Sequence, residues 1–369
     1  MRVMHMINAM HRGGAESVVL EHVRHAGPDV ETWVCAINGG GEALDQAGRL
    51  GAHTSVLDKS GGHLSTFGRL ARTLRDARID VVNGHNPSGA FHATLAGRLA
   101  GVPAIVRTEH SIHFAGRASW AYEPALEPLL TLLAQRVICV SNAVRESHVR
   151  RLSLLAGRFV TIPNGISEAT PARSRDQVRT SLGAGSSDRI VLTVGGLTPQ
   201  KAQLILIEAF ASMVRDVPAA RLWIAGEGAE RPRLEERIAA LGLGPRAILL
   251  GMRGDVPDLI EAADLFVLSS VREGLSMALL EAMRGSRPVV ATRVGGNAEV
   301  VVEGELGHIV PPSDAGALAR AMRSVLADPA GAAAMGQAGR RRWLESFTAE
   351  RMLRLTEDLY REQLARAGR

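Results

Sequence analysis

The sequence predicts an α/β protein made of two doubly wound parallel sheets, each in its own domain. Short β-branched runs alternate with longer helical segments along the chain, which is the pattern of parallel strands joined by crossover helices. The chain has 369 residues, more than one hydrophobic core usually organises. A polar segment at 167–177, with no apolar pattern of its own, separates the two series of strands.

Each half repeats the same alternation of strand and helix. In the first half we expect strands at 2–7, 32–37, 80–85, 103–110, 136–141 and 158–166, with helices at 15–26, 89–100 and 142–152. In the second half we expect strands at 189–195, 220–226, 247–251, 265–270 and 288–292, with helices at 203–216, 231–242, 255–263 and 276–283.

We place the first domain at 1–170 and the second at 171–345. Two such sheets in tandem are expected to face each other across a cleft, with ligands beyond the carboxyl ends of the strands. The loops after the strands are therefore where function is sought. The last segment, 346–369, contains a helical pattern at 349–366, and the sequence leaves open whether it crosses back to the first domain.

The composition indicates a folded protein with an acidic partner. Hydrophobic residues make up 46% and charged residues 22%, and the net charge of +5 favours a nucleotide or a phospholipid surface. Aromatic residues are only 4% and are not interleaved with basic runs, so no nucleic acid is expected. Cys35 and Cys139 lie alone in apolar runs, which argues for reduced core thiols and against a metal cluster. Without a signal peptide or an 18-residue apolar run, we expect a cytoplasmic protein that does not span a membrane.

The segment 271–283 combines the pattern of a buried helix with two glutamates, Glu273 and Glu281. From Ser276 onward the segment has no polar face, which is typical of a helix inside a domain. An unpaired buried carboxylate is costly, so Glu281 needs a partner. One interpretation is an ion pair with Arg284, three residues on. The other is that the carboxylate accepts hydrogen bonds from the hydroxyl groups of a ligand.

Glycine-rich loops at the strand ends favour a phosphate-bearing ligand. Gly13 and Gly14 precede a helix, where backbone amides bind anions; a tight turn without a ligand is the alternative. Lys201 lies at the start of another helix, in position to neutralise a phosphate, and 274–276 lead into the helix of Glu281. None of these loops fits the dinucleotide fingerprint or a P-loop, so redox chemistry with NAD is unsupported.

A set of motifs in chain order resembles the family-4 retaining glycosyltransferases, also called glycosyl transferases group 1, which have the GT-B fold. The most specific motif is the E-x7-E element "EGLSMALLEAM" at 273–283. The others are "GGAE" (13–16), "VSNAV" (140–144), "IPNGI" (162–166), "VGGLTPQK" (194–201), "LWIAGEG" (222–228), "LLGMRGDVPDLIEAADLFVLSS" (249–270), "PVVATRVGGNAEVV" (288–301) and "GHIVPPSD" (307–314). Together they span nearly the whole chain. The resemblance implies a nucleotide-diphosphate sugar held by the second domain and an acceptor held by the first.

The resemblance also implies roles for single residues. Glu281 would bind the ribose, Glu273 the donor sugar and Lys201 the diphosphate. Gly14 would approach the diphosphate from the first domain, and His110 would lie near the reacting carbon. The remaining donor-binding residues implied are Gly274, Leu275 and Ser276 at the phosphate or sugar, and Met252 and Arg253 beside the base.

Two positions depart from the family pattern VGRLxxxKG. Gly196 stands where the family has an arginine, and Ala202 stands where it has a glycine. The missing arginine is a bidentate partner for the diphosphate, so its loss bears directly on donor binding. We expect one of three arginines in loops facing the same cleft to substitute for it: Arg12, Arg272 or Arg293.

The expected reaction transfers a sugar from a nucleotide-diphosphate sugar, UDP favoured over GDP, to a saccharide or lipid-linked acceptor in cell-surface polysaccharide or glycoconjugate synthesis. We expect no cofactor and no metal, with retention through same-face attack by the acceptor hydroxyl. His110 and Glu273 are the expected catalytic residues. His85 and Asn86, at a strand end, are expected on the acceptor side, with a simple turn as the alternative. The competing functions are a nucleotide-sugar epimerase and a non-catalytic partner that has lost donor binding.

A basic face is expected on the helix that includes 67–78. Arg69, Arg72, Arg75 and Arg78 recur every three residues. The simplest interpretation is a solvated surface. The alternative is a peripheral contact with an anionic membrane, at the inner face of the cytoplasmic membrane, which would suit a lipid-linked acceptor.

Overall fold

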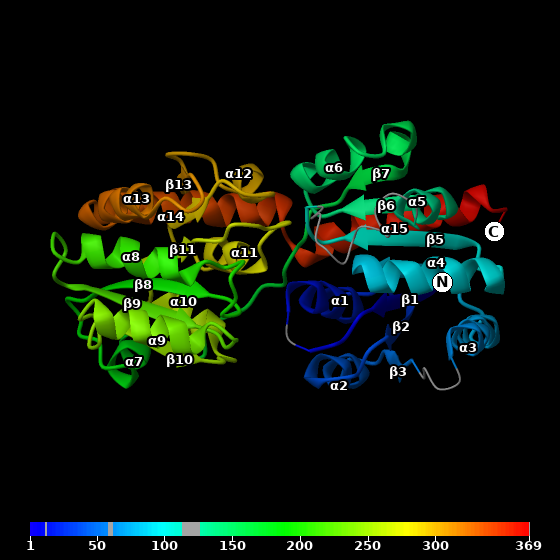
Figure 1. The fold of residues 1–369 in the computed structure, drawn as a ribbon, viewed down its shortest axis with the longest axis horizontal. Helices are drawn as coiled ribbons and strands as arrows, with labels where there is room; N and C mark the ends of the chain where they lie inside the picture. Colours follow the sequence, from blue (N-terminus) through cyan, green and yellow to red (C-terminus); the bar gives the residue numbers. More distant parts are fainter. Residues whose placement is uncertain (12, 58–61, 113–125, 369) are drawn as a thin grey trace. The chain divides into compact units, whose positions relative to one another are not determined.

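The computed structural model describes residues 1–11, 13–57, 62–112 and 126–368. The chain forms two compact units (Figure 1). Unit 1 contains Met1–Ser167 and Ala349–Arg369, and unit 2 contains Glu168–Thr348. The chain thus leaves unit 1 inside the polar segment that separates the two series of strands, and its last helix belongs to unit 1.

The described part of unit 1 holds a parallel seven-stranded sheet in the order β3-β2-β1-β4-β5-β6-β7. The chain moves outward from β1 in both directions, as in other doubly wound sheets. The strands are β1 (Arg2–Ile7), β2 (Glu31–Ala36), β3 (His53–Val56), β4 (Val81–His85), β5 (Ala104–Glu109), β6 (Arg136–Cys139) and β7 (Phe159–Thr161). The helices are α1 (Gly14–Arg24), α2 (Glu42–Arg49), α3 (Gly62–Asp76), α4 (Asn86–Ala100), α5 (Glu127–Leu133), α6 (Asn142–Val149), the 3-10 helix η2 (Ser153–Arg158) and α15 (Ala349–Arg366).

Helices cover both faces of this sheet. On one face, Ile7 packs with Val19 of α1 and with residues of α2. On the other face, Met4 and Met6 pack with residues of α3 and α4. Because side chains alternate along a strand, the intervening His5 lies on the same face as Ile7. A buried histidine on an otherwise apolar strand is the first sign of a polar row inside this unit.

The described part of unit 2 holds a parallel six-stranded sheet in the order β10-β9-β8-β11-β12-β13. The strands are β8 (Arg189–Val194), β9 (Ala220–Ala225), β10 (Ala247–Gly251), β11 (Leu265–Leu268), β12 (Val289–Thr292) and β13 (Gly307–Val310). The helices are α7 (Arg175–Ser181), α8 (Gln203–Met213), α9 (Arg231–Ala240), α10 (Val256–Ala262), α11 (Met277–Arg284), α12 (Asn297–Val300), α13 (Ala315–Ala327) and α14 (Pro329–Ser346). The order changes direction between β8 and β11, and this switch point is where such sheets bind ligands.

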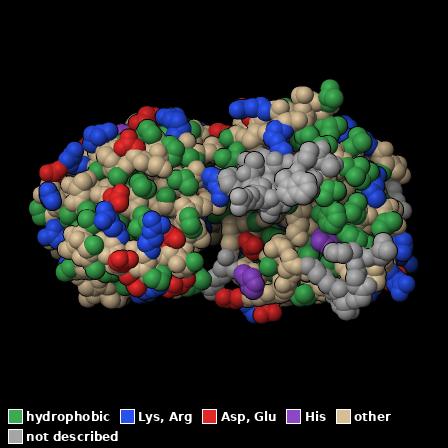
Figure 2. Space-filling view, in the orientation of Figure 1, with side chains coloured by type: hydrophobic (Ala, Val, Ile, Leu, Met, Phe, Trp, Pro, Cys, Tyr) green, Lys and Arg blue, Asp and Glu red, His purple; other side chains and the backbone are tan. Residues whose placement is uncertain are grey.

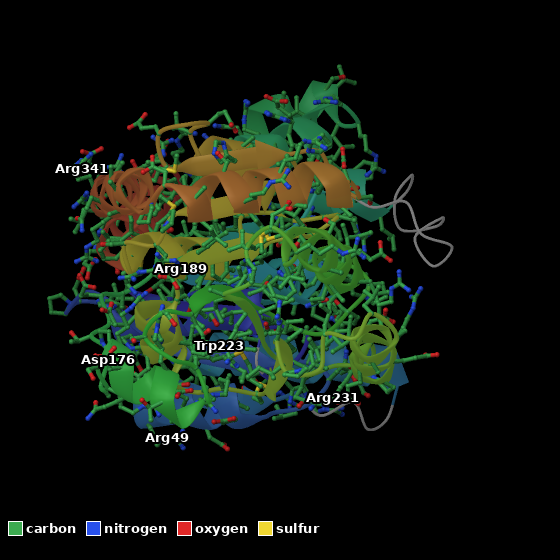
Figure 3. The ribbon with its side chains drawn as sticks, turned by 90° about the vertical axis from the view of Figure 1, so that its left-hand side faces the viewer. Arg49, Asp176, Arg189, Trp223, Arg231 and Arg341 are labelled. Atoms are coloured by element: carbon green, nitrogen blue, oxygen red, sulfur yellow. The ribbon has the colours of Figure 1, made fainter. Side chains whose placement is uncertain are left out.

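The core of unit 2 is strongly apolar. One face of the sheet packs on α8, α9 and α13 through residues such as Leu222, Phe210 and Met322. Trp223 lies inside the unit, while Arg231 and Arg341 are at its outside (Figure 3). This packing fixes the strand ends and therefore the loops that follow them.

The α/β class and the two doubly wound parallel sheets are confirmed. The strands β3 and β13 were not predicted: all four residues of β3 are exposed, and β13 is short and follows a glycine-rich turn. Cys35 and Cys139 are buried free thiols, and burial raises the pKa of both. Among the described helices, none is long and apolar enough to cross a membrane.

Candidate functional site

In unit 2, the loops after β8 and β11 meet at an ion pair between Lys201 and Glu273. Lys201 Nζ lies 2.7 Å from Glu273 Oε1, and the hydroxyl of Ser270 donates to the same oxygen at 2.6 Å. The Glu273 side chain is 8% exposed and the Lys201 side chain 23% exposed. The buried carboxylate is thus compensated by an ammonium group that is still accessible to a ligand.

Further hydrogen bonds hold these two loops together. Val271 N donates to Gln200 O at 2.9 Å, and Gln200 Nε2 donates to Arg272 O at 3.0 Å. Ser269 Oγ donates to Lys201 O at 2.9 Å. Lys201 precedes α8, which begins two residues later, so the β11 loop and not the helix sets its position.

The loop after β12 approaches the same place. Gly295 has a φ of 49°, and a Cβ at this position would lie 1.9 Å from Glu273 O. Gly296 N donates to Gly274 O at 2.6 Å. Only glycine allows this loop to pack against the backbone of the β11 loop. Three strand-end loops therefore converge on the Lys201–Glu273 pair.

The start of α11 carries a buried hydroxyl group. Ser276 immediately precedes the helix and is 3% exposed, and its Oγ has no hydrogen-bond partner among the described residues. Gly274 and Leu275 are buried in the same loop. A helix start presents N–H groups and partial positive charge, which favour anions. An unsatisfied buried hydroxyl group at this point fits a phosphate-bearing ligand.

Glu281 lies about one helical turn beyond the start of α11. It is partly buried, and together with Arg284 it lines a pocket that also includes the segment 168–171. Lys201 and Glu273 do not line that pocket. The structure therefore brings Lys201, Glu273 and the 274–276 loop together, whereas Glu281, further along α11, lines a separate pocket.

The loop after β10 carries Met252 and Arg253. Met252 is 56% exposed and so is accessible to a ligand. Arg253 donates to the carboxylate of Asp255 at 2.8 and 2.6 Å, and this pairing lowers the pKa of Asp255. A fixed guanidinium group next to an exposed thioether fits contact with a planar base.

The position of the missing arginine, Gly196, is open. A Cβ there would meet its nearest neighbours at 3.7 Å, an ordinary van der Waals distance. Of the three arginines expected to substitute, Arg12 lies outside the described residues. Arg272 directly precedes Glu273, and Arg293 directly follows β12 and is exposed. Both lie in the loops that converge on the ion pair.

In unit 1, Gly14 is the first residue of α1. The preceding Gly13 has a φ of −171°, which is extended backbone. Extended backbone is open to any residue, so the conformation of this turn does not require glycine. Asn86 begins α4 directly after β4 and is in the left-handed region, with a φ of 59°.

His110 follows β5 directly and is partly buried. Its Nε2 lies 2.9 Å from Nδ1 of His85, the last residue of β4. His85 is fully buried, and its Nε2 lies 2.9 Å from Nδ1 of His5. Burial lowers the pKa of His110 and of His5 to about 4, and it lowers the pKa of His85 well below its ordinary value. At neutral pH these imidazoles are therefore uncharged.

Sequence reasoning did not single out His5 or Ser270. Both are polar residues in or at the end of an apolar strand, and such a residue is a signal because a buried polar group needs a partner. Which partner it finds depends on the strand order, which a single strand does not reveal.

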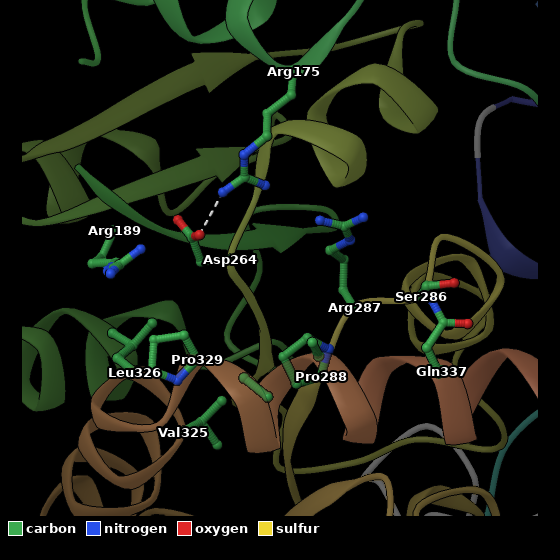
Figure 4. Close-up of a pocket in the computed structure, with 12 residues that line it drawn as sticks. Arg175, Arg189, Asp264, Ser286, Arg287, Pro288, Val325, Leu326, Pro329 and Gln337 are labelled. Carbon is green, nitrogen blue, oxygen red and sulfur yellow. Dashed lines mark hydrogen bonds and ion pairs between the residues drawn. The ribbon is translucent and has the colours of Figure 1, made fainter. Parts of the chain in front are cut away.

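A second cavity in unit 2, of about 250 Å³, lies at the amino ends of the strands (Figure 4). Arg175 points at Asp264 there, with Nη2 2.5 Å from Oδ1. Asp264 also accepts from Arg179 and from Ile190 N, each at 2.6 Å. Arg175 and Arg287 donate to the carbonyl groups at the end of α10. We interpret this cluster as a structural brace, since its charged groups are already paired within the unit.

Comparisons with known proteins place the chain in a family. The model described as Glycosyltransferase Family 4 matches residues 12–169, and the model described as Glycosyl transferases group 1 matches residues 174–342. The putative glycosyltransferase EpsD of Bacillus subtilis is 31% identical over 304 residues, 79% of this chain and 79% of that protein. The chain belongs to this family of glycosyltransferases.

Other similar proteins support the same fold and class. A UDP-Gal:alpha-D-GlcNAc-diphosphoundecaprenol alpha-1,3-galactosyltransferase of Escherichia coli is 28% identical, covering 70% of this chain and 69% of that protein. Anabaena HepE, solved in complex with UDP, superposes with a TM-score of 0.83 at 21% identity, covering 98% of this chain and all of that one. The fold is therefore GT-B.

Proposed function

We propose that the protein transfers a sugar from a UDP-sugar to a saccharide or lipid-linked acceptor with retention of configuration. The observation that carries this proposal is the Lys201–Glu273 ion pair at the junction of three strand-end loops. Relatives and fold neighbours whose names include UDP support the choice of nucleotide.

Donor binding would rearrange the ion pair. The diphosphate attracts the ammonium group of Lys201, and the start of α11 with the free hydroxyl of Ser276 offers further donors. Glu273, relieved of its lysine, then accepts hydrogen bonds from the hydroxyl groups of the sugar. Glu281 takes the ribose hydroxyl groups, and Met252 and Arg253 line the base.

The same groups stabilise the reaction. Departure of UDP builds negative charge on the diphosphate, which Lys201 and the α11 start hold without a bound cation. The acceptor hydroxyl group attacks the sugar carbon on the face that the diphosphate leaves, and its proton passes to the leaving phosphate. The C–O bond to UDP breaks, the new glycosidic bond forms, and the configuration is retained. His110, which is neutral, orients the sugar by a hydrogen bond.

The diphosphate still needs a partner for the charge that the family arginine supplies. We propose that Arg12, Arg272 or Arg293 provides it, because Gly196 provides no side chain. Alanine replacements of each, compared by their affinity for UDP, test this idea. One variant is expected to weaken UDP binding, and three variants with unchanged affinity would contradict it.

We further propose that unit 1 contacts an anionic membrane. Leu99, Leu129, Leu132 and Leu154 are 61%, 46%, 54% and 100% exposed, and Figure 2 shows hydrophobic side chains gathered on the visible face of unit 1 around α4 and α5. Arg98 and Arg158 donate to carbonyl groups at the end of α5 and so lie beside these leucines. Exposed apolar groups next to guanidinium groups suit a lipid surface.

Sedimentation with vesicles tests the membrane contact. Binding to anionic vesicles at low salt, and its loss in a Leu132→Ser, Leu154→Ser double variant, is expected. Equal binding by a control variant on α3, Arg72→Ser, would show that the leucines and not the basic face of α3 dominate. No binding of the wild type to anionic lipid would end this proposal.

A transfer assay tests the overall function. Purified protein is supplied with UDP-sugars and saccharide or lipid-linked acceptors, and release of UDP together with a glycosylated product is expected. The anomeric configuration of that product, read by NMR, tests retention, and assays with and without EDTA test independence from metal. UDP binding without turnover would favour the alternative of a non-catalytic partner, and conversion of the sugar without an acceptor would favour an epimerase.

A further inference from the structure

Three imidazoles of unit 1 form one hydrogen-bonded chain. His5 Nδ1 lies 2.9 Å from His85 Nε2, and His85 Nδ1 lies 2.9 Å from His110 Nε2. This histidine chain, made of His5, His85 and His110, crosses three neighbouring strands, β1, β4 and β5. Asn83, two residues before His85, is the register partner of His5, and Thr108, two residues before His110, is the register partner of His85. The histidine chain therefore runs diagonally across the strands, from the interior of the sheet to its carboxyl edge.

The neutral state of the rings constrains this chain. A neutral imidazole donates from one ring nitrogen and accepts at the other. The two hydrogen bonds must therefore point the same way, either from His5 towards His110 or in the reverse direction. In both cases Nε2 of His110 is engaged by protein, so its Nδ1 is the ring nitrogen outside the chain.

A second polar row braces the same face of the sheet. The amide group of Asn83 donates to Tyr360 Oη of α15 at 2.7 Å, and Thr108 Oγ1 donates to Asn83 Oδ1 at 3.0 Å. At the inner end of the chain, the ring of His22 from α1 lies 4.9 Å from that of His5. At the outer end, the carboxylate of Glu109 acts on His110 through its charge. Of these contacts, the Thr108–Asn83 hydrogen bond joins β5 to β4 and so supports the register that the histidine chain requires.

We propose that His85 is a positioning residue for His110, fixing its ring orientation and tautomer as part of the His5–His85–His110 chain. This inference rests on the proposed function, in which His110 orients the sugar. It also changes the role expected for His85: a side chain with 0% exposure and both ring nitrogens bonded to protein has none left for an acceptor. A lone, partly buried imidazole could flip and exchange its nitrogen and carbon positions. The hydrogen bond between His85 and His110 prevents that flip.

Two variants of His85 cut the chain at different links. The amide oxygen and nitrogen of asparagine are bonded to Cγ, as Nδ1 is in histidine. His85→Asn therefore keeps a hydrogen-bond partner for His110 and loses the hydrogen bond to His5. Glutamine reaches further, towards the position of Nε2, so His85→Gln keeps a partner for His5 and loses the link to His110. Melting temperatures of both variants, measured in the full chain, report whether folding is intact.

The first readout is turnover. His85→Gln is expected to lower kcat by about tenfold, the loss of one hydrogen bond, with KM for the donor within about threefold of wild type. His85→Asn is expected to keep kcat within about threefold. Wild-type turnover in His85→Gln, or equal losses in two folded variants, would overturn the inference.

The second readout does not need activity. In protein labelled with 15N at histidine, the ring nitrogens of His110 are expected to report a single neutral tautomer in the wild type and in His85→Asn. An average of two tautomers is expected in His85→Gln. Identical His110 shifts in wild type and His85→Gln would overturn the inference. A wild-type protein that binds or transfers no nucleotide sugar would refute the proposed function instead and leave the spectroscopic result to decide this one.

Discussion

Glu273 Oε1 accepts from both Lys201 Nζ and Ser270 Oγ, so a single carboxylate oxygen links two strand-end loops of unit 2. In the proposed cycle the lysine turns to the diphosphate and the glutamate to the sugar. Binding of the diphosphate by Lys201 and binding of the sugar by Glu273 can therefore be tested separately by removing the carboxylate charge alone.

We predict that Glu273→Gln binds UDP as well as or better than wild type, because Lys201 is no longer neutralised. Sugar transfer should fall by about 10- to 100-fold, since hydrogen bonds to a charged group are worth about 1.5–3 kcal/mol. Calorimetry with UDP and a transfer assay measure the two effects. Glu235→Gln, at an exposed carboxylate on α9, is the control and should change neither. Weaker UDP binding in Glu273→Gln would argue against the exchange of partners.

Ala202 is strained, and we predict that Ala202→Gly stabilises unit 2. Ala202 has a φ of 49° as the residue before α8, a left-handed conformation that costs a non-glycine residue about 1–2 kcal/mol. Part of the gain is offset by the greater flexibility of glycine in the unfolded chain, so a net increase of about 0.5–1 kcal/mol is expected. Urea unfolding measures it. Ala321→Gly, in the middle of α13, should destabilise, and a loss of stability in both variants would contradict the argument.

The carboxylate of Asp264 is predicted to make a large contribution to the stability of unit 2. It accepts from Arg175, Arg179 and the backbone of Ile190. Asp264→Asn leaves the buried guanidinium group of Arg179 and the partly buried one of Arg175 without their counter-charge and should cost about 3–5 kcal/mol. Asp216→Asn, at an exposed ion pair with Arg323, should cost no more than about 1 kcal/mol in the same unfolding assay. Similar small losses in the two variants would show that the cluster is not a brace.

Unit 1 is predicted to lose stability as the pH falls below the ordinary pKa of a histidine, about 6.5. Burial lowers the folded-state pKa of His5 to about 4 and that of His22 well below its ordinary value. The unfolded chain therefore binds more protons, and the stabilising contribution is present above about pH 6.5 and is lost towards pH 4. Each such histidine changes the free energy of unfolding by up to about 1.4 kcal/mol per pH unit.

The variant His22→Gln isolates one of these groups. It should show a smaller difference in unfolding free energy between pH 7.5 and pH 5 than wild type, whatever its stability at pH 7.5. A wild-type slope in His22→Gln would mean that His22 is not buried as a neutral ring.

Local pattern was enough to predict the fold class, the position of the 277–284 helix and the strand-end loops. The apolar runs of β1 and β8 are recognisable because burial on both faces of the sheet leaves no polar face. The helix α11 differs from the expectation, because it is buried on one face only and carries Glu281 and Arg284 on its partly exposed face. The edge strand β3 could not be recognised, since its residues His53–Val56 are exposed and carry no such pattern.

The contacts inside the candidate site were not predictable in the same way. That Lys201 and Glu273 lie near each other follows from strand order, but the ion pair depends on how the β11 loop turns. The His5–His85 bond depends on a parallel register offset by two residues, which no single segment reveals. His85 was accordingly expected on the acceptor side, whereas the structure buries it between two other histidines.

The most direct test of the central claim is calorimetric titration of UDP into the wild type, Lys201→Met and Arg233→Met. Arg233 is an exposed cation on α9, so its loss changes the net charge equally without touching the strand-end loops. The account predicts saturable UDP binding by the wild type and by Arg233→Met, with affinity about 10- to 100-fold lower in Lys201→Met. No binding by the wild type, or equal affinity in Lys201→Met, would contradict a donor site built around Lys201.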